Sequence, residues 1–281
     1  MEITKEIVIR LIKEQFPKWG NLTISPVEKS GHDNRTFHLG DSMLIRLPSD
    51  KCYEPAVQKE STWLPYLSKH ISYQITKPIA IGKPSTEYPY TWSINEWIDG
   101  ETLSESYCNN SDFVKELTDC LKQLQSIDTN GGPVAGLHNF YRGGDLCVYD
   151  DETRKALNDL NDKIDTDICT YIWERALSSK WNRAPVWVHG DVAEGNILVK
   201  DNTLVGLIDF GVLAIGDPAC DLVIAWTFFD EKCRKQFIKA MDLDINTWYR
   251  AMGWALWKAL ITYDNQISKK VIDILIKEYT L

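Results

Sequence analysis

The stretch VHGDVAEGNILV, residues 188–199, places Asp191 and Asn196 five positions apart, just before an apolar run. A second stretch, LIDFG at residues 207–211, places Asp209 directly after another strand-like segment. An Asp–Asn pair before a strand is often only turn chemistry. Three oxygen-bearing side chains around one hairpin, however, combine a carboxylate that can accept a hydroxyl proton with the oxygen ligands that Mg²⁺ prefers. We therefore interpret the three residues as a candidate site for phosphoryl transfer.

The regions on either side of this hairpin differ in pattern. Short apolar and β-branched runs predict strands in the first hundred residues, with a tight turn at Gly40-Asp41 and one helix at 56–70. Beyond Gly100 the apolar spacing is helical, and Ser111 is the expected N-cap of a helix over 111–127. Strands first and helices after predict an α+β chain of two lobes, residues 1–98 and 99–281, with the catalytic hairpin in the second.

Composition limits the classes of partner. The 281 residues carry a net charge of −9, which argues against nucleic acid or an anionic membrane as the main partner. Seven cysteines without a CxxC pair indicate reduced thiols in a cytoplasmic protein. The N-terminal segment is expected to be an amphipathic helix and not a signal peptide, and no stretch is apolar enough to cross a bilayer. A small molecule is the expected partner, and nothing in the sequence specifies an oligomeric state.

Several motifs in order resemble the aminoglycoside phosphotransferase family, whose fold is protein-kinase-like. HGDVAEGN and LIDFG look like its catalytic and metal-binding segments. SGHDNRTFHLGDSMLIRLP resembles its first hairpins, KESTWLPYLSKH its N-lobe helix and WSINEWIDGETL its lobe-connecting hinge. GDPACDLVIAW and WALWKALI resemble later elements of the family. The resemblance covers most of the chain and implies a bilobal kinase-like fold, with a nucleotide-binding lobe followed by a catalytic and substrate-binding lobe.

The resemblance implies a role for each matching residue. Asp191 matches the catalytic base, and Asn196 and Asp209 match the Mg²⁺ ligands. Arg46 stands at the strand position whose lysine holds the phosphates of ATP or GTP, and Glu60 at that of the helix glutamate that pairs with it.

Further nucleotide contacts follow from the same comparison. The hinge is expected to offer backbone hydrogen bonds to the purine from Asn95, Glu96, Trp97 and Ile98. Ser30, Asn34 and backbone N–H groups are expected to contact phosphate, because the loop holds only Gly31 and is not a glycine-rich phosphate loop. Asp217 and Asp221 resemble residues that brace the catalytic loop.

This chain departs from the family pattern at two places. Arg46 replaces the usual lysine; a guanidinium is a fixed cation with a planar fork, so it can bind phosphate in a different geometry. Val-Ala-Glu-Gly fills the positions between Asp191 and Asn196, so that Glu194 is an additional acid near the site.

Other features have two interpretations. Trp248, Trp254 and Trp257 recur at near-helical spacing and are expected in the core or in the wall of a groove, the alternative being a platform for a sugar ring. The acidic residues of 150–167 are expected to form a solvated helix face or, alternatively, a negative rim for a polycationic substrate. His189 is expected to be buried and hydrogen-bonded and not a metal ligand.

The first functional expectation is an enzyme: a nucleotide- and Mg²⁺-dependent O-phosphotransferase that acts on a hydroxyl of an aminoglycoside-like or other antibiotic. A kinase of an endogenous metabolite and a catalytically silent nucleotide-binding protein of the same fold are the alternatives. A dinuclear phosphoesterase is disfavoured, because such sites usually need several histidines and the five present form no close pair. The preference between ATP and GTP is left open.

Overall fold

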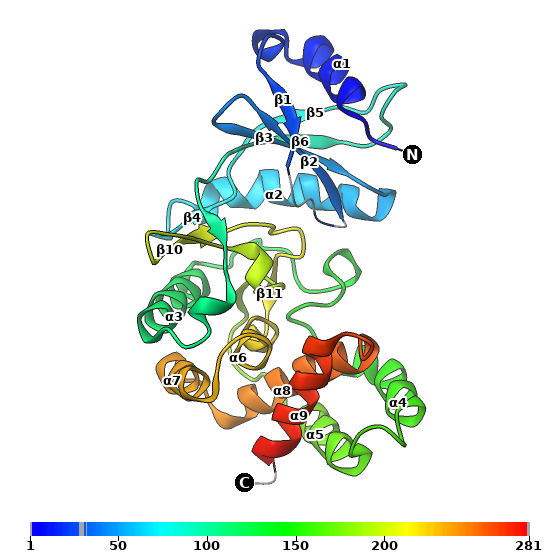
Figure 1. The fold of residues 1–281 in the computed structure, drawn as a ribbon, viewed down its shortest axis with the longest axis vertical. Helices are drawn as coiled ribbons and strands as arrows, with labels where there is room; N and C mark the ends of the chain where they lie inside the picture. Colours follow the sequence, from blue (N-terminus) through cyan, green and yellow to red (C-terminus); the bar gives the residue numbers. More distant parts are fainter. Residues whose placement is uncertain (1, 28–30, 32, 280–281) are drawn as a thin grey trace. The chain divides into compact units, whose positions relative to one another are not determined.

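The computed structural model describes residues 2–27, 31 and 33–279, whose packing divides into two units (Figure 1). The first unit comprises Met1–Gly100 and Val205–Gly211, and the second comprises Glu101–Leu204 and Val212–Leu281. Strands dominate the first unit and helices the second, as the α+β prediction requires. The predicted lobes, residues 1–98 and 99–281, stay a prediction.

The first unit is built on an antiparallel sheet of five strands in the order β1-β2-β3-β6-β5. These strands are β1 (Ile24–Pro26), β2 (Asn34–Leu39), β3 (Met43–Pro48), β5 (Pro78–Gly82) and β6 (Trp92–Glu96). The remaining elements are α1 (Lys5–Gln15), η1 (Pro17–Trp19), η2 (Lys51–Tyr53), α2 (Glu54–Leu67) and β4 (Gln74–Ile75). The end of β10 (Thr203–Leu207) pairs in parallel with β4.

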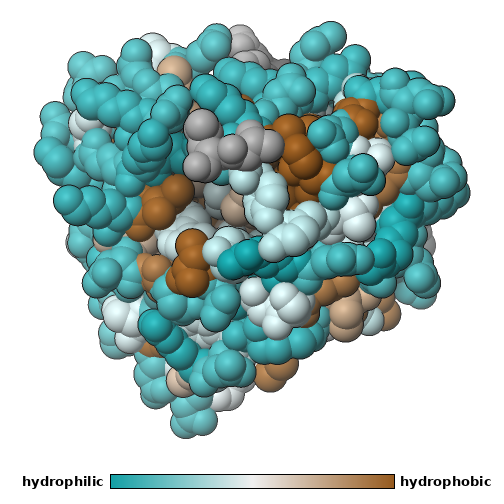
Figure 2. Space-filling model, turned by 90° about the horizontal axis from the view of Figure 1, so that it is seen from below, coloured by the Kyte–Doolittle hydropathy of each residue, from teal (hydrophilic) through white to brown (hydrophobic). Residues whose placement is uncertain are grey.

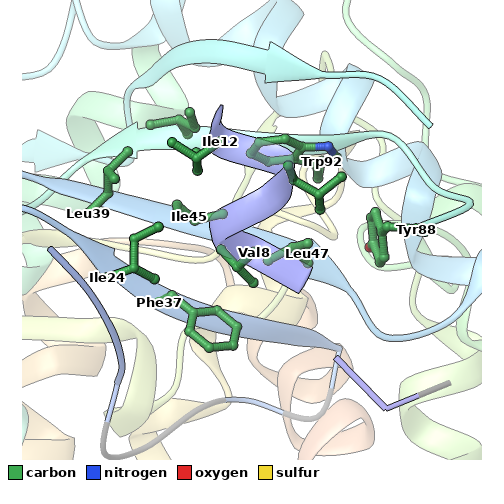
Figure 3. Close-up of a cluster of buried hydrophobic side chains, with 11 residues drawn as sticks. Val8, Ile12, Ile24, Phe37, Leu39, Ile45, Leu47, Tyr88 and Trp92 are labelled. Atoms are coloured by element: carbon green, nitrogen blue, oxygen red, sulfur yellow. The ribbon is translucent and has the colours of Figure 1, made fainter. Parts of the chain in front are cut away.

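One face of this sheet is covered by α1. Figure 3 shows the buried cluster, in which Val8 and Ile12 of α1 meet Ile45 and Leu47 of β3 and Trp92 of β6. Because side chains alternate along a strand, the residue between Ile45 and Leu47 points to the opposite face. Burying each such aliphatic side chain contributes about 1.5–3 kcal/mol, so this cluster fixes the register of β3.

The opposite face carries α2, which spans Glu54–Leu67 where the sequence predicts a helix at 56–70. Val57, Glu60 and Leu64 are buried at the three- and four-residue spacing of one helix face. Glu60 is therefore directed from α2 toward the face of the sheet onto which β3 projects Arg46.

The second unit is mainly helical. Its α-helices are α3 (Ser111–Ser126), α4 (Asp150–Asp159), α5 (Thr166–Ser178), α6 (Ile224–Thr227), α7 (Glu231–Met241), α8 (Ile245–Ile261) and α9 (Gln266–Tyr279). Its short helical turns are η3 (Glu105–Tyr107), η4 (Leu137–Asn139), η5 (Leu146–Tyr149), η6 (Glu194–Asn196) and η7 (Pro218–Leu222). Two antiparallel pairs join β7 (Glu101–Thr102) to β9 (Ile197–Lys200), and β8 (Val186–Val188) to β11 (Ala214–Gly216).

The start of α3 corrects one prediction. Ser111 is the first helical residue, and the N-cap is Asn110, whose side chain accepts hydrogen bonds from the N–H groups of Asp112 and Phe113. Both residue types cap helices well, and the apolar periodicity does not locate a helix start to within one residue. The predicted apolar face is confirmed, since all five of its members are buried: Phe113, Val114, Leu117, Leu121 and Leu124.

Helix α8 lies at the centre of the second unit and contacts α4, α5 and α9. Its crossing with α5 is close, because a Cβ atom added at Gly253 would lie 2.5 Å from the Cβ of Ala176. Trp248, Trp254 and Trp257 are all buried on α8, which confirms the prediction that they belong to the core.

Figure 2 shows one face on which hydrophilic residues predominate and hydrophobic ones form separate patches. All seven cysteines are free thiols. Within the described ranges, no helix combines the length and the apolar character needed to span a membrane.

Candidate active site

The loop after β8 positions Asp191. Gly190 has φ +85°, and a Cβ atom there would lie 2.7 Å from the backbone oxygen of Val212, so the close approach of the two segments requires glycine. The Nδ2 group of Asn196 donates to the backbone oxygen of Asp191 at 3.0 Å and to its Oδ2 at 2.9 Å. These bonds fix the orientation of the exposed Asp191 carboxylate. Among the described residues, the amide oxygen of Asn196 accepts no hydrogen bond.

A buried carboxylate holds the backbone directly before Asp191. The two oxygens of Asp221 accept hydrogen bonds from the N–H groups of His189 and Gly190, each at 2.7 Å. The N–H of Asp191 in turn donates to Nδ1 of His189 at 3.2 Å. His189 is fully buried, which confirms that it is a buried, hydrogen-bonded residue. Three successive N–H groups are thereby fixed in the loop that carries Asp191.

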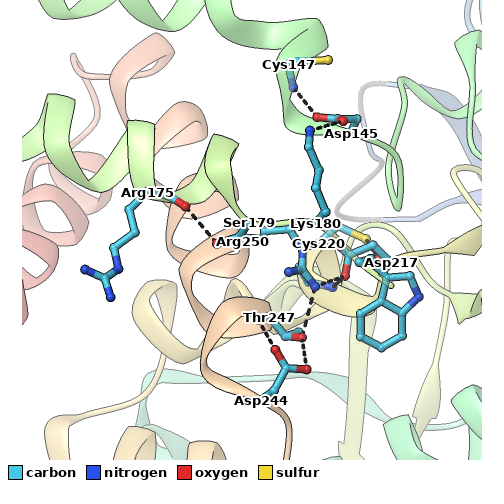
Figure 4. Close-up of polar contacts among 12 residues, drawn as sticks. Asp145, Cys147, Arg175, Ser179, Lys180, Asp217, Cys220, Asp244, Thr247 and Arg250 are labelled. Atoms are coloured by element: carbon cyan, nitrogen blue, oxygen red, sulfur yellow. Dashed lines mark hydrogen bonds and ion pairs between the residues drawn. The ribbon is translucent and has the colours of Figure 1, made fainter. Parts of the chain in front are cut away.

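A second ion pair anchors the turn that carries Asp221. Arg250 of α8 donates from Nε to Asp217 Oδ2 at 2.5 Å and from Nη2 to Asp217 Oδ1 at 3.1 Å (Figure 4). Asp217 also caps η7 by accepting from the N–H of Ala219. Thr247 joins this network through its hydroxyl, which accepts from Arg250. The chain of contacts runs from α8 through η7 to the backbone of the catalytic loop, so Asp217 acts through the position of Asp221.

Burial dominates the electrostatics of both bracing carboxyl groups. Desolvation raises the pKa of Asp221, while His189 and the two backbone donors act in the opposite direction. Desolvation likewise raises the pKa of Asp217 against the effect of Arg250. Arg250 was not identified in the sequence, although an arginine within the apolar run of α8 requires a carboxylate partner when it is buried.

The first unit brings together three of the predicted residues. Arg46 donates from Nη1 to both oxygens of Glu60, at 3.0 and 3.3 Å, and from Nη2 to Asp209 Oδ1 at 2.6 Å. The predicted pairing of Arg46 with Glu60 is therefore present. The planar fork lets one side chain bind two carboxylates at once, a geometry that the single nitrogen of lysine does not reproduce.

These charges are mutually compensated. Burial opposes the charge on Arg46, but Asp209 and Glu60 outweigh it and raise the pKa of the guanidinium. Burial raises the pKa of the Glu60 carboxyl, and the ion pair with Arg46 counteracts this shift. Asp209 keeps 39% of its side chain exposed and has a left-handed φ of +63°. A non-glycine residue with positive φ is strained, and such residues are common at functional sites.

The predicted hinge residues occupy the end of β6 and the segment after it. The N–H of Glu96 donates to the backbone oxygen of Lys77, and that of Trp97 to the backbone oxygen of Ser42. The N–H of Ile98 has no acceptor among the residues that the structure describes, so it is the hinge donor that remains for a ligand. The side-chain amide of Asn95 is 1% exposed, and neither of its polar atoms finds a partner in that part of the chain.

Asn34 and Ser30 are the predicted phosphate contacts from side chains. Asn34 begins β2, at the start of the strand that pairs with β3. Ser30 lies outside the described residues. The predicted Mg²⁺ ligands Asn196 and Asp209 belong to the second and the first unit respectively. Their amide and carboxylate oxygens are the hard donors that fit Mg²⁺.

A cavity of about 220 Å³ opens beside Asp191 within the second unit. Asp191 and Glu194 line it from the catalytic loop, and Trp254 and Trp257 line it from α8. The same two tryptophans therefore belong both to the core and to the wall of this cavity. A carboxylate at the edge of a mostly apolar cavity can orient a hydroxyl of a bound molecule and accept its proton.

Comparison with known proteins identifies a family whose model matches most of the chain. The family model for the phosphotransferase enzyme family matches residues 23–254. The uncharacterized protein YcbJ of Bacillus subtilis (strain 168) is 26% identical over 187 residues, which is 64% of this chain and 56% of YcbJ. The match thus spans little more than half the length of that relative.

Solved structures at low identity share the fold. The GDP complex of wild-type aminoglycoside 2′-phosphotransferase-IIIa has a TM-score of 0.73 at 20% identity, over 99% of this chain and 98% of that chain. The GDP and kanamycin complex of an APH(2″) enzyme has a TM-score of 0.71 at 19% identity, over 98% and 99% of the two chains. Macrolide 2′-phosphotransferase type I has a TM-score of 0.64 at 14% identity, over 98% of both chains.

The predicted fold is thus confirmed as the bilobal, kinase-like α+β fold of these phosphotransferases. The family model covers the strands that carry Arg46 and Asn95, the catalytic loop and the segment of Asp209. The resemblance inferred from the motifs is confirmed, and the chain belongs to the phosphotransferase enzyme family.

Proposed function

We propose that this protein transfers the γ-phosphoryl group of ATP or GTP to a hydroxyl group of a small molecule. The observation that carries the proposal is the geometry of Asp191. Its carboxylate is oriented by Asn196, its backbone is fixed by buried Asp221 through the two preceding residues, and it lines the cavity of the second unit. Such fixed placement of a proton acceptor beside a bound hydroxyl is what this reaction requires.

In the proposed step the acceptor oxygen attacks the γ-phosphorus and the bond to the bridging oxygen of the leaving nucleoside diphosphate breaks. The hydroxyl proton passes to the carboxylate of Asp191. Arg46, held between Glu60 and Asp209, has N–H groups beyond those bonded to the carboxylates, and these can bind phosphate oxygens. The N–H of Ile98 is the hinge donor that we assign to the purine.

Asn196 and Asp209 would hold Mg²⁺, because the amide oxygen of Asn196 is uncommitted and Asp209 retains an exposed carboxylate. When bound, the ion supplies charge neutralisation at the phosphates. Solved relatives contain GDP, ADP or ATP, which supports a nucleotide as the donor. We propose a cytoplasmic enzyme, in keeping with its free cysteines.

The acceptor is proposed from the class of hydroxylated antibiotics and metabolites. Titles of solved relatives name kanamycin, streptomycin, gentamicin and macrolides, and they concern those proteins. An aminoglycoside-like acceptor is one candidate, and an endogenous metabolite is the other.

The test is acceptor-dependent release of ADP or GDP in the presence of Mg²⁺, over a panel of aminoglycosides, macrolides and hydroxylated metabolites. Asp191→Ala is expected to lower turnover by about a hundredfold or more, while the Mg²⁺–nucleotide complex still raises the melting temperature. Asp162→Ala, which alters an exposed aspartate of the same unit, is the matched control and is expected to retain full turnover. Nucleotide binding with no transfer to any acceptor would instead favour a catalytically silent protein.

A further inference from the structure

The cavity beside Asp191 contains a cation in an aromatic setting. Arg142 lines the cavity, and its guanidinium carbon lies 5.0 Å from the ring centroid of Trp254 and 4.8 Å from that of Trp257. A Cβ atom at Gly190 would be 3.1 Å from the Cβ of Arg142, so the arginine lies against the residue that precedes Asp191. Arg142 and Asp191 therefore line one cavity.

The aromatic wall that holds Arg142 is itself fixed. Trp257 stacks on Tyr149 with centroids 4.0 Å apart, and its Nε1 donates to Glu152 at 2.7 Å. Trp254 meets Trp257 edge to face at 5.7 Å. Cation–π contact on two fixed rings stabilises the charged guanidinium without using its N–H donors.

Arg142 differs from the buried arginines of the protein in its lack of a carboxylate partner among the described residues. Arg46, Arg234 and Arg250 each donate to at least one carboxylate. The side chain of Arg142 makes no hydrogen bond or ion pair with any described residue, although it is half-buried. Held against two rings with its N–H donors uncommitted in the described chain, this half-buried guanidinium can bind an anion that enters the cavity.

The loop that carries Arg142 is built to hold it there. Phe140 and Tyr141 both have left-handed backbones, with φ of +52° and +54°. Fully buried Asn139 donates from Nδ2 to the backbone oxygens of Arg142 and Val212 and accepts from the N–H of Gly136. Two consecutive strained residues persist only where the surroundings hold them, which is typical of segments that position a functional group.

We infer that Arg142 binds an anionic group, a carboxylate or a phosphate, on the acceptor while Asp191 receives its hydroxyl. This inference rests on the proposed function and names the class of acceptor: a hydroxylated molecule with an anionic group and an apolar or planar face. Lys258, which also lines the cavity and lies on an exposed position of α8, adds a second cation. Phe228 and Ile267 provide further apolar wall.

The cavity lining places two carboxylates beside the two cations. Asp191 and Glu194 are the acidic residues that line the cavity. Within the acidic segment of 150–167, Asp150 accepts from Trp173, Glu152 accepts from Trp257 and Asp165 caps α5. These three carboxylates are thus engaged with their own unit, and a polycationic acceptor in the cavity would meet Arg142 and Lys258 beside Asp191 and Glu194.

The test is a binding experiment that requires no phosphoryl transfer. Four matched probes share a benzyl alcohol and differ in one group: para-hydroxymethylbenzoate, para-hydroxymethylphenyl phosphate, neutral para-methylbenzyl alcohol and cationic para-aminomethylbenzyl alcohol. Ligand-observed NMR titration is run on the full chain and on Arg142→Met, which keeps the apolar stem on the tryptophans. Arg154→Met, at an ion-paired arginine on α4 outside the cavity lining, is the matched control. Melting temperatures verify that each variant folds.

At least one anionic probe is expected to bind about tenfold more tightly than the neutral and cationic probes. The preferred anion distinguishes a carboxylate from a phosphate acceptor. Arg142→Met is expected to abolish the preference, Arg142→Lys to retain part of it, and Arg154→Met to leave it unchanged. The inference is overturned if the cationic probe binds as tightly as the anions, if the preference survives Arg142→Met, or if no anionic probe shows saturable binding. Turnover in the acceptor panel decides the proposed function separately, since kanamycin phosphorylation unaffected by Arg142→Met would uphold the kinase and reject the anion site.

Discussion

Replacing Asp221 with asparagine tests how the catalytic loop is held. The carboxylate is fully buried, and its two oxygens accept the N–H groups of His189 and Gly190 at 2.7 Å. Asparagine has the same shape but only one acceptor oxygen. Its NH₂ group would face an N–H donor, so one backbone group directly before Asp191 would lose its partner.

The expected loss of stability follows from that lost hydrogen bond. A hydrogen bond to a charged acceptor is worth about 1.5–3 kcal/mol, and a buried unsatisfied N–H costs about 1–3 kcal/mol. Removing the buried charge offsets part of this loss in stability, because desolvation already disfavours the ionised form of Asp221. We expect a net loss of about 2–3 kcal/mol in the free energy of unfolding, which lowers the melting temperature by about 4–10 °C. A displacement of about 1 Å at Asp191 would lower kcat about a hundredfold.

Thermal denaturation and steady-state transfer kinetics measure the two effects together. Nucleotide affinity is expected to change little, since Arg46 and Glu60 belong to the other unit. Asp230→Asn is the matched control, because Asp230 is the N-cap of α7 and asparagine caps helices equally well. If Asp221→Asn melts and turns over like the wild type, the two backbone hydrogen bonds do not hold the loop and the reasoning is refuted.

Three further changes test other parts of the structure. Burial lowers the pKa of Lys59 to about 8 from 10.5, so between these values the unfolded state binds more protons than the folded state and stability rises with pH. Lys59→Met is therefore expected to raise the free energy of unfolding by at most about 3 kcal/mol near neutral pH, and by less as the pH rises from 8 to 10.5. Urea denaturation at several pH values measures this gain. A gain that does not depend on pH would contradict the reasoning. Asn95→Leu removes a buried amide without a partner in the described chain, and it should leave the melting temperature of the nucleotide-free protein unchanged or higher. A clear drop would reveal a partner for that amide. Gly253→Ala forces a Cβ atom to 2.5 Å from that of Ala176 and should cost about 1–3 kcal/mol, so an unchanged melting temperature would show that α5 and α8 can separate.

Local patterns in the sequence are sufficient to predict much of the structure of the first unit. Alternation in β3 places Ile45 and Leu47 toward α1 and Arg46 toward α2, as the structure has it. The pairing of Arg46 with Glu60 followed from resemblance alone, because residues fourteen positions apart on a strand and a helix have no local signal that joins them. The additional bond from Arg46 to Asp209 was not predicted, since it depends on a backbone turn at Asp209 with positive φ.

Around Asp191, local sequence pattern predicts some contacts and misses others. The spacing of Asp191 and Asn196 predicts that they act together, and a side-chain hydrogen bond of 2.9 Å joins them. The contributions of Arg250 and Arg142 were missed. Each depends on a contact between elements far apart in the sequence, Arg250 with Asp217 and Arg142 with the tryptophans of α8. Apolar spacing specifies the buried face of a helix, but it does not specify which distant charge lies against that face.

Transfer of a radiolabelled γ-phosphate in a single turnover tests the central claim most directly. Wild type and Asp191→Ala, each saturated with Mg²⁺ and labelled ATP or GTP, are mixed with the small-molecule fraction of a cell extract and with the acceptor panel. The account predicts that label passes to a small-molecule product in the wild type and not in the variant, while both proteins bind nucleotide. Label transferred equally by the two proteins would contradict the role of Asp191. Bound nucleotide that never yields a labelled product with any acceptor would contradict the assignment of phosphoryl transfer itself.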